Sequence, residues 1–165
     1  MEHVTMLKNQ TKFKDAKQLK KDYDNVFSWY IRTRDGWKCQ RCGTEYAPPT
    51  KVLQCSHYEN RANMATRFYP PNCMAACNPC HAYHLEGKKH GEYTQIMQRR
   101  MNDTEYNLLL LKIDEGKARP TKFSRGDYIC MIAMCVKDLK ELAVYSPYKT
   151  TIIEHTKKWG GIDRA

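Results

Sequence analysis

Apolar residues recur every three or four positions in the first part of the chain, and this spacing predicts a helix over residues 16–34. They fall at positions that form one stripe on a helix, namely Tyr23, Val26, Phe27, Tyr30 and Ile31. Such a stripe faces a core. Gly36 ends the pattern, and residues 1–15 are lysine-rich without periodicity, so we expect a basic flexible arm before the helix.

The last third of the chain has the same helical periodicity. It predicts helices over 92–101, over 103–115 and from about 126 to 145, separated by a linker that contains Pro120. The apolar side of the second holds Tyr106, Leu109, Leu110 and Ile113, and that of the third holds Tyr128, Ile129, Ile132, Val136, Leu139 and Leu142. No element is assigned to residues 146–165.

The middle of the chain has a different pattern. Residues 52–58 predict a short strand, residues 59–67 are polar, and Pro70-Pro71 forces an extended turn before a returning strand that begins near Asn72. A helix is expected to open at His81. The predicted class is therefore α+β, with an arm (1–15), a core with its leading helix (16–100) and a helical extension (101–165).

Charge points to a nucleic-acid partner. The chain carries 28 Lys and Arg against 18 Asp and Glu, a formal net charge of +10. Basic proteins gain affinity for DNA or RNA by releasing counterions from the phosphates. No apolar stretch is long enough to cross a membrane, and the polar start resembles no secretory leader, so we expect a protein of the reducing cytoplasm.

Two Cys-x-x-Cys knuckles predict a structural zinc site. Cys39 and Cys42 form the first, and Cys77 and Cys80 form the second. Four thiolates in two such pairs suit a closed tetrahedral zinc site better than a set of disulfides. The other four cysteines are expected to be free thiols: Cys55, Cys73, Cys130 and Cys135.

Three polar residues beside the knuckles have an order suited to phosphodiester hydrolysis. Hydrolysis needs a base for the water and a cation on the phosphate. His57, at the end of the predicted strand, suits the base because its pKa lies near neutrality. Asn72, on the returning strand, is placed to orient that base, and His81 to bind the metal ion. Strand, strand and helix with these residues form a ββα-metal arrangement.

The chain resembles the HNH nucleases at these positions, and more widely the NinG (Rap) recombination endonucleases of bacteriophages. FSWYIRTRDGWKCQRCG resembles their helix and first knuckle, and QCSHYENRANMATRFYPPNCMAACNPCHAYH resembles their central motif. The resemblance extends over residues 20–145. It implies an HNH core with a four-cysteine zinc knot, flanked by one leading helix and C-terminal helices.

The function that the resemblance implies is a Mg²⁺- or Mn²⁺-dependent endonuclease that cleaves branched DNA during phage recombination, such as D-loops or Holliday-type junctions. The protein would work in the cytoplasm of a bacterial host cell, and symmetrical cutting of a junction would favour a homodimer. His57 would be the general base, Asn72 would orient either the base or the motif loop, and His81 would bind the catalytic ion.

One departure affects the ligands of the catalytic ion. Many HNH nucleases have an Asp or His before the base, where this chain has Ser56, a poor ligand. Substitutes on the chain are Gln54, Glu59, Asn60 and His84. His84 follows His81 by three residues and is assigned here as a second ligand, although a surface histidine is an equal interpretation.

Basic residues around the motif are candidates for contacts with phosphate. Arg67 is the candidate for offsetting charge in the transition state, because an arginine can hold a phosphate bidentately. Arg61, Lys88 and Lys89 are assigned to DNA binding. For both arginines the alternative is a solvated loop side chain.

Two other functions remain open. One is a different HNH enzyme, such as a homing, restriction or packaging-associated nuclease. The other is a non-catalytic zinc-bound DNA-binding module, which the charge and the knuckles would fit equally well but which has no need of His57 and His81.

Overall fold

The computed structural model describes residues 14–85 and 90–159, with the side chains of 83–85 and 90 left out. The chain divides into two compact units, one made of residues up to 34 together with those from 123 onward, the other of residues 35–122. This division differs from the expected boundary near residue 100. The expected arm at 1–15 lies almost wholly outside the described residues.

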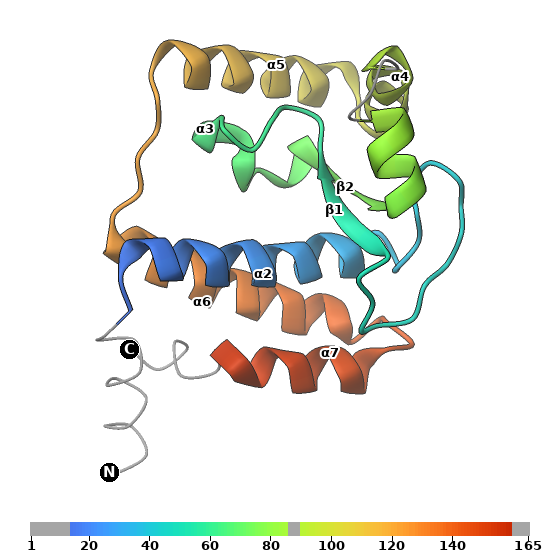
Figure 1. The fold of residues 1–165 in the computed structure, drawn as a ribbon, viewed down its shortest axis with the longest axis vertical. Coiled ribbons are helices and arrows are strands. Elements are labelled where there is room, and N and C mark those ends of the chain that lie inside the picture. Colours follow the sequence, from blue (N-terminus) through green and yellow to red (C-terminus); the bar gives the residue numbers. More distant parts are fainter. Residues whose placement is uncertain (1–13, 86–89, 160–165) are drawn as a thin grey trace. The chain divides into compact units, whose positions relative to one another are not determined.

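The first unit is helical and is built around α2 (Ala16–Arg34) and α6 (Arg125–Ala143). The two helices lie side by side (Figure 1). Each buries most of the stripe that its sequence predicts, with Val26 and Ile31 inaccessible on α2, and Ile132 and Leu139 on α6. Tyr30, Ile129 and Leu142 are half-buried. Because its apolar partner is α6, residues 16–34 group with the C-terminal helices and not with the middle of the chain.

The end of the chain, to which the sequence assigned no element, contributes α7 (Lys149–Thr156) and the 3₁₀ turn η3 (Lys157–Trp159). The imidazole of His155 stacks on Trp29 of α2 with ring centroids 3.6 Å apart. Burial lowers the pKa of His155 to about 4, so this ring is neutral and packs as an aromatic. The tail is thus part of the core of the first unit.

The second unit contains the sheet, which confirms the α+β class. β1 (Leu53–His57) pairs antiparallel with β2 (Cys73–Cys77), in a register that sets Leu53 opposite Cys77 and His57 opposite Cys73. All five residues of β2 are buried. Such burial on both faces explains why CMAAC lacks the polar alternation of a half-exposed strand.

Short turns flank the strands where the sequence predicted simpler elements. Asn72 is the last residue of the 3₁₀ turn η1 (Pro70–Asn72) and precedes the strand on which it was expected. The second knuckle leads into a π-helical turn, η2 (Cys80–Leu85), where an α-helix was expected to open. The helices α4 (His90–Arg100) and α5 (Asp103–Ala118) follow within about two or three residues of their predicted bounds.

A one-turn helix within the polar loop, α3 (Met64–Arg67), packs on α5. Asn63 caps α3 with its side-chain oxygen and donates from Nδ2 to the Ile113 carbonyl of α5 at 2.9 Å. The approach is close because α5 has a glycine there. A Cβ on Gly116 would lie 2.7 Å from the Ala65 Cβ and would overlap the Asn63 amide.

Asp35 joins the first knuckle to the strand and to α4. Its buried carboxylate accepts from the backbone N–H of Ala75 at 2.7 Å and pairs with Arg100 at 2.9 Å. The backbone N–H of Gln40 donates to the Ala75 carbonyl at 2.9 Å. Both polar groups of the Ala75 peptide are thus held by the segment that carries Cys39 and Cys42.

No helix within the described ranges, 14–85 and 90–159, is long and apolar enough to cross a membrane.

The contact at Gly116 gives a first prediction. Gly116→Ala should lower the free energy of unfolding by roughly 1–3 kcal/mol, because a buried methyl group is forced against Asn63 and Ala65. Gly91→Ala is the matched control on α4, since no heavy atom lies within 4 Å of its added Cβ. Urea unfolding of both variants is the measurement, and equal stabilities would contradict the α3–α5 contact.

Candidate functional site

The first knuckle is a tight turn shaped by its backbone. The Cys39 N–H donates to the Thr44 carbonyl, and the Gly43 N–H returns to the Cys39 carbonyl, each at 2.9 Å. Gly43 has φ +76°, a conformation that glycine adopts without strain. The turn directs Cys39 and Cys42 to one side, toward the second knuckle.

The four knuckle cysteines converge as the sequence predicts. The sulfur atoms of Cys39, Cys42, Cys77 and Cys80 all lie within 4.8 Å of one another, and those of Cys42 and Cys77 are 3.8 Å apart. Sulfur atoms on a tetrahedral zinc ion with bonds near 2.3 Å are about 3.8 Å apart. This group can hold a metal ion, and its donors fit structural zinc.

Burial and hydrogen bonding shift the pKa values of the knuckle cysteines in opposite directions. Burial raises the pKa of Cys80 to about 12 and also raises that of Cys39. The hydrogen bond between the Cys42 sulfur and the Thr44 hydroxyl, at 3.2 Å, lowers the pKa of Cys42 to about 6. A metal ion that binds here would therefore have to displace the protons of Cys39 and Cys80.

Arg41 supplies further positive charge at this cluster. Its Nη1 lies 3.6 Å from the Cys80 sulfur, and its Nε pairs with Glu92 of α4 at 2.9 Å. Hydrogen bonds of this kind orient the ligands of a metal and reduce the net negative charge of a four-thiolate site. They also fasten α4 to the knuckles.

His57, the predicted base, lies half-buried at the end of β1 with both ring nitrogens engaged. Its Nε2 is 2.9 Å from the backbone oxygen of Arg67, and Arg61 Nε approaches Nδ1 at 3.4 Å. A carbonyl only accepts and a guanidinium only donates, so Nε2 carries the proton and Nδ1 is the basic nitrogen. This tautomer places the lone pair on the side of Arg61.

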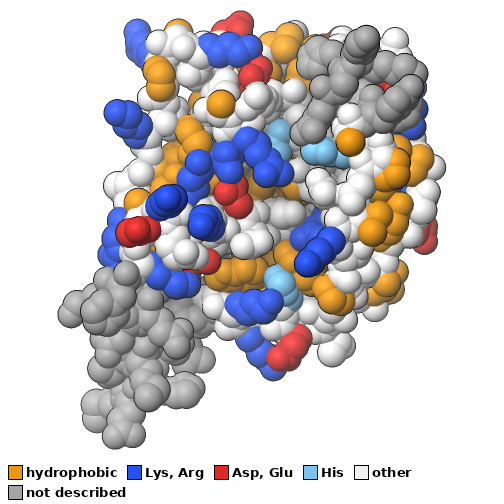
Figure 2. All heavy atoms as spheres, viewed as in Figure 1, with side chains coloured by type: hydrophobic (Ala, Val, Ile, Leu, Met, Phe, Trp, Pro, Cys, Tyr) orange, Lys and Arg blue, Asp and Glu red, His pale blue; other side chains and the backbone are white. Residues whose placement is uncertain are grey.

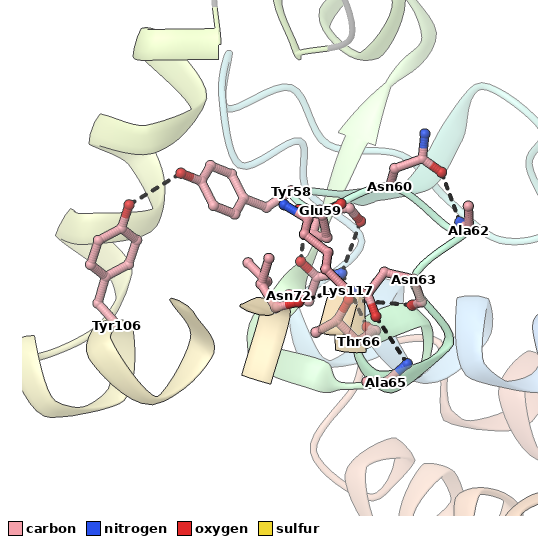
Figure 3. A network of polar contacts seen from close by, with 11 residues as sticks. Tyr58, Glu59, Asn60, Ala62, Asn63, Ala65, Thr66, Asn72, Tyr106 and Lys117 are labelled. Carbon is pink, nitrogen blue, oxygen red and sulfur yellow. Dashed lines mark hydrogen bonds and ion pairs between the residues drawn. The ribbon is translucent and has the colours of Figure 1, made fainter. Parts of the chain in front are cut away.

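Asn72 is fully buried and holds the loop between the strands. Its side-chain oxygen accepts from the Glu59 N–H at 2.8 Å, and Nδ2 donates to the carbonyls of Glu59 and Thr66 at 3.1 and 3.0 Å (Figure 3). Of the two roles considered for Asn72, these contacts match the orientation of the loop. The loop in turn brings the Arg67 carbonyl to His57.

The two arginines contact this site in different ways. Arg61 touches the base directly and also reaches the Cys55 carbonyl through Nη2 at 3.4 Å. Arg67 contributes its backbone oxygen, while its guanidinium donates to the Arg61 carbonyl at 3.0 Å. The exposed arginine beside the basic nitrogen is therefore Arg61, although the sequence favoured Arg67 for a catalytic role.

Ser56 is not exposed to the site. Its side chain is inaccessible to solvent, and its hydroxyl accepts from Tyr93 of α4 at 3.1 Å. Among the substitutes considered for it, Glu59 pairs with Lys117 of α5 at 2.9 Å, and Asn60 accepts from the Ala62 N–H. The pairing with Glu59 raises the pKa of Lys117.

The structure describes only some of the other residues predicted to bind the ion or DNA. His81 is half-buried in η2, and no cluster of three or more metal-binding side chains in the described residues includes it. The side chain of His84 is outside the described residues, as are Lys88 and Lys89.

A second cluster of ligand atoms was not anticipated. The sulfur atoms of Cys55 and Cys73 and one ring nitrogen of His57 lie within 4.8 Å of one another. Cys55 and Cys73 were expected to be free thiols. The Cys-x-His spacing within a strand sets Cys55 and His57 on one face and could have indicated that pair, whereas Cys73 joins them only through the strand register.

Comparison of the chain with protein-family models, with curated proteins and with solved structures found no match.

The four-cysteine cluster predicts a loss of stability when one ligand is removed. Cys77→Ser should bind zinc far more weakly and unfold at a lower temperature, because one thiolate of the tetrahedral set is missing. Cys130→Ser, at an exposed thiol of α6, is the control. Metal analysis and thermal unfolding are the measurements; folded wild-type protein without zinc would refute the site.

The contacts of Asn72 predict a second effect on stability. Asn72→Ala should lower the free energy of unfolding by about 2–4 kcal/mol, because it leaves buried groups of Glu59 and Thr66 without partners. Asn60→Ala, at an exposed position with one local bond, should cost about 1 kcal/mol or less. Urea unfolding compares them, and similar values would contradict the role assigned to Asn72.

Proposed function

We propose that this protein is a metal-dependent, structure-selective DNA endonuclease that hydrolyses phosphodiester bonds in branched recombination intermediates. We further propose that β1, β2 and the helical segment after the second knuckle form a ββα-metal core of the HNH type. The observation that carries the proposal is the pair of contacts on the His57 ring, because they favour the tautomer in which Nδ1 accepts a proton. The Arg67 carbonyl lies 2.9 Å from Nε2, and Arg61 Nε lies 3.4 Å from Nδ1.

In the proposed reaction, His57 Nδ1 accepts a proton from the attacking water as its oxygen bonds to phosphorus. The bond from phosphorus to the leaving oxygen breaks, and that oxygen takes a proton from solvent. The Arg67 carbonyl stabilises the resulting imidazolium through the proton on Nε2. Both interactions depend on a ring held in one orientation, which the loop bonded to Asn72 provides. The water therefore meets a base that needs no reorientation.

Arg61 is the side chain that we propose for contact with the scissile phosphate. Its side chain is exposed, and its Nε is within reach of the nitrogen that would accept the proton. When a phosphate is bound, transfer of the guanidinium from the ring to the phosphate oxygens would expose Nδ1 and offset the charge of the transition state.

A divalent ion, when bound, would polarise the phosphate and stabilise the leaving oxygen. His81 is the ligand proposed for it from the resemblance to HNH nucleases. His84 is the second ligand proposed on the same ground. Imidazole nitrogens together with phosphate oxygens and waters would suit Mn²⁺ at least as well as Mg²⁺.

The charge of the protein supports DNA as the substrate. The formal net charge is +10, and Lys and Arg side chains are spread over the face drawn in Figure 2. A positive surface favours any nucleic acid, so the preference for branched DNA rests on the resemblance to the NinG group. Symmetrical cleavage of a junction would require two copies of the chain.

The test is cleavage of labelled duplex, single-stranded, flap, D-loop and four-way-junction DNA with Mg²⁺ or Mn²⁺. His57→Ala should lower the cleavage rate by roughly 10²–10⁴-fold, because the base is lost. His81→Ala should also lose activity, but higher Mn²⁺ should restore part of it if His81 is a ligand of the ion. The defect of His57→Ala should not respond to Mn²⁺.

DNA affinity of each variant, measured by fluorescence anisotropy without a catalytic ion, separates binding from chemistry. Retained affinity with lost cleavage supports the enzyme. If His57→Ala cleaves at the wild-type rate, the HNH assignment is wrong. If the wild-type chain binds DNA but cleaves none of the substrates, the protein is a zinc-bound DNA-binding module and not a nuclease. A preference for unbranched duplex would favour another HNH nuclease.

A further inference from the structure

The face of the hairpin that carries His57 also carries two buried thiols. Cys55 precedes His57 by two positions on β1, and Cys73 is the residue opposite His57 on β2. Strand alternation and register thus bring all three side chains to one face. Cys55 and Cys73 are 3% and 1% exposed, and neither belongs to the four-cysteine cluster.

The ligand atoms of this group are already close together. The two sulfur atoms and one nitrogen of His57 lie within 4.8 Å of one another. The Cys73 sulfur is 4.0 Å from the Arg67 oxygen, which also receives the hydrogen bond of His57 Nε2 at 2.9 Å. Ligand atoms around a tetrahedral ion are about 3.5–3.8 Å apart, so small side-chain rotations would complete the geometry.

The chemistry of the three donors selects a particular class of ion. Two thiolates and an imidazole are soft or borderline ligands that bind Zn²⁺ or Co²⁺, whereas Mg²⁺ prefers carboxylate, phosphate and water oxygens. Three protein ligands leave one position of a tetrahedral ion for water. The group therefore resembles an open zinc site and differs from the closed four-cysteine site.

We propose that Cys55, His57 and Cys73 bind a second thiophilic divalent ion, Zn²⁺, and that this ion blocks the base. The binding of the ion is argued from the three side chains alone. The proposal that the ion blocks the base rests on the proposed nuclease function. The two thiols lose their protons on binding, and the ion takes a lone pair from the imidazole.

Either ring nitrogen gives the same result. An ion on Nδ1 occupies the lone pair that would accept the proton from water. An ion on Nε2 displaces the hydrogen bond to the Arg67 carbonyl, and the ring proton then resides on Nδ1. In both states the imidazole has no lone pair for water. The catalytic ion, bound through oxygen-rich ligands, does not compete for the thiolates.

Cobalt spectroscopy on the full chain tests the binding step. Protein loaded with one equivalent of Zn²⁺ should take up one equivalent of Co²⁺ and develop the near-ultraviolet absorption of cobalt–thiolate bonds. Cys73→Ala and Cys55→Ala, each tested separately, should lose that absorption. Cys130→Ser, at an exposed thiol outside the cluster, should retain it.

Two results would overturn the proposal. One is the absence of cobalt–thiolate absorption in folded, reduced wild-type protein. The other is absorption that persists undiminished in both alanine variants, since the cobalt would then sit in the four-cysteine cluster. Circular dichroism establishes that each variant is folded, and two separate substitutions guard against a variant that fails to fold.

Cleavage in Mg²⁺ with added Zn²⁺ tests the block, expressed for each protein as the rate with zinc divided by its own rate without zinc. The wild-type ratio should fall by roughly 10²-fold or more, as for removal of a general base. In Cys73→Ala the ratio should stay near one. If the protein binds cobalt but zinc does not slow cleavage, the proposed block is wrong. If the protein binds cobalt but cleaves no DNA at all, the result counts against the proposed nuclease and not against the metal site.

Discussion

The convergence of four cysteine sulfur atoms is the constraint on which the second unit depends. Cys77 ends β2 and lies opposite Leu53, the first residue of β1, so the cluster sits where the two strands enter and leave the hairpin. The first knuckle is attached to β2 by both polar groups of the Ala75 peptide. A two-stranded hairpin is marginal in water, and structural zinc contributes about 10–16 kcal/mol in small zinc-binding peptides.

The opposite end of the hairpin is determined by hydrogen bonds and not by the thiolates. There the buried amide of Asn72 forms hydrogen bonds with the backbone of Glu59 and Thr66. Asn63 attaches the same loop to α5. The loop then presents the Arg67 carbonyl to His57. A residue with no direct bond to the imidazole thereby sets its tautomer, which is why Asn72 belongs to the site despite its burial.

The sequence predicted best those features that depend on local spacing. The bounds of α2 and the four-cysteine cluster follow from periodicity and from paired knuckles, and both are confirmed. The pairing of α2 with α6 joins residues about a hundred positions apart, and no local pattern encodes it. α7 was missed because its eight residues are too few to show a helical period, although Ile152 is fully buried.

Features that depend on strand register could not be predicted from the sequence for the same reason. The pairing of His57 with Cys73, which creates the second cluster, requires knowing which residues face each other across a loop of 15 residues, 58–72. The roles of the two arginines also depend on how that loop folds, since Arg67 turns its backbone, and Arg61 its side chain, toward the ring.

Strand alternation also explains why His57 has soft neighbours. Ser56, immediately before it, is buried under Tyr93, whereas Cys55 and Cys73 share its cluster. An Asp or His at position 56 would have to replace a buried hydroxyl that accepts a hydrogen bond, and an unpaired charge there is costly. The side chains that share a ligand group with the ring or contact its Nδ1 are thus two thiols and an arginine. Under the proposed function, the proton of a water molecule and a thiophilic ion would compete for the same imidazole.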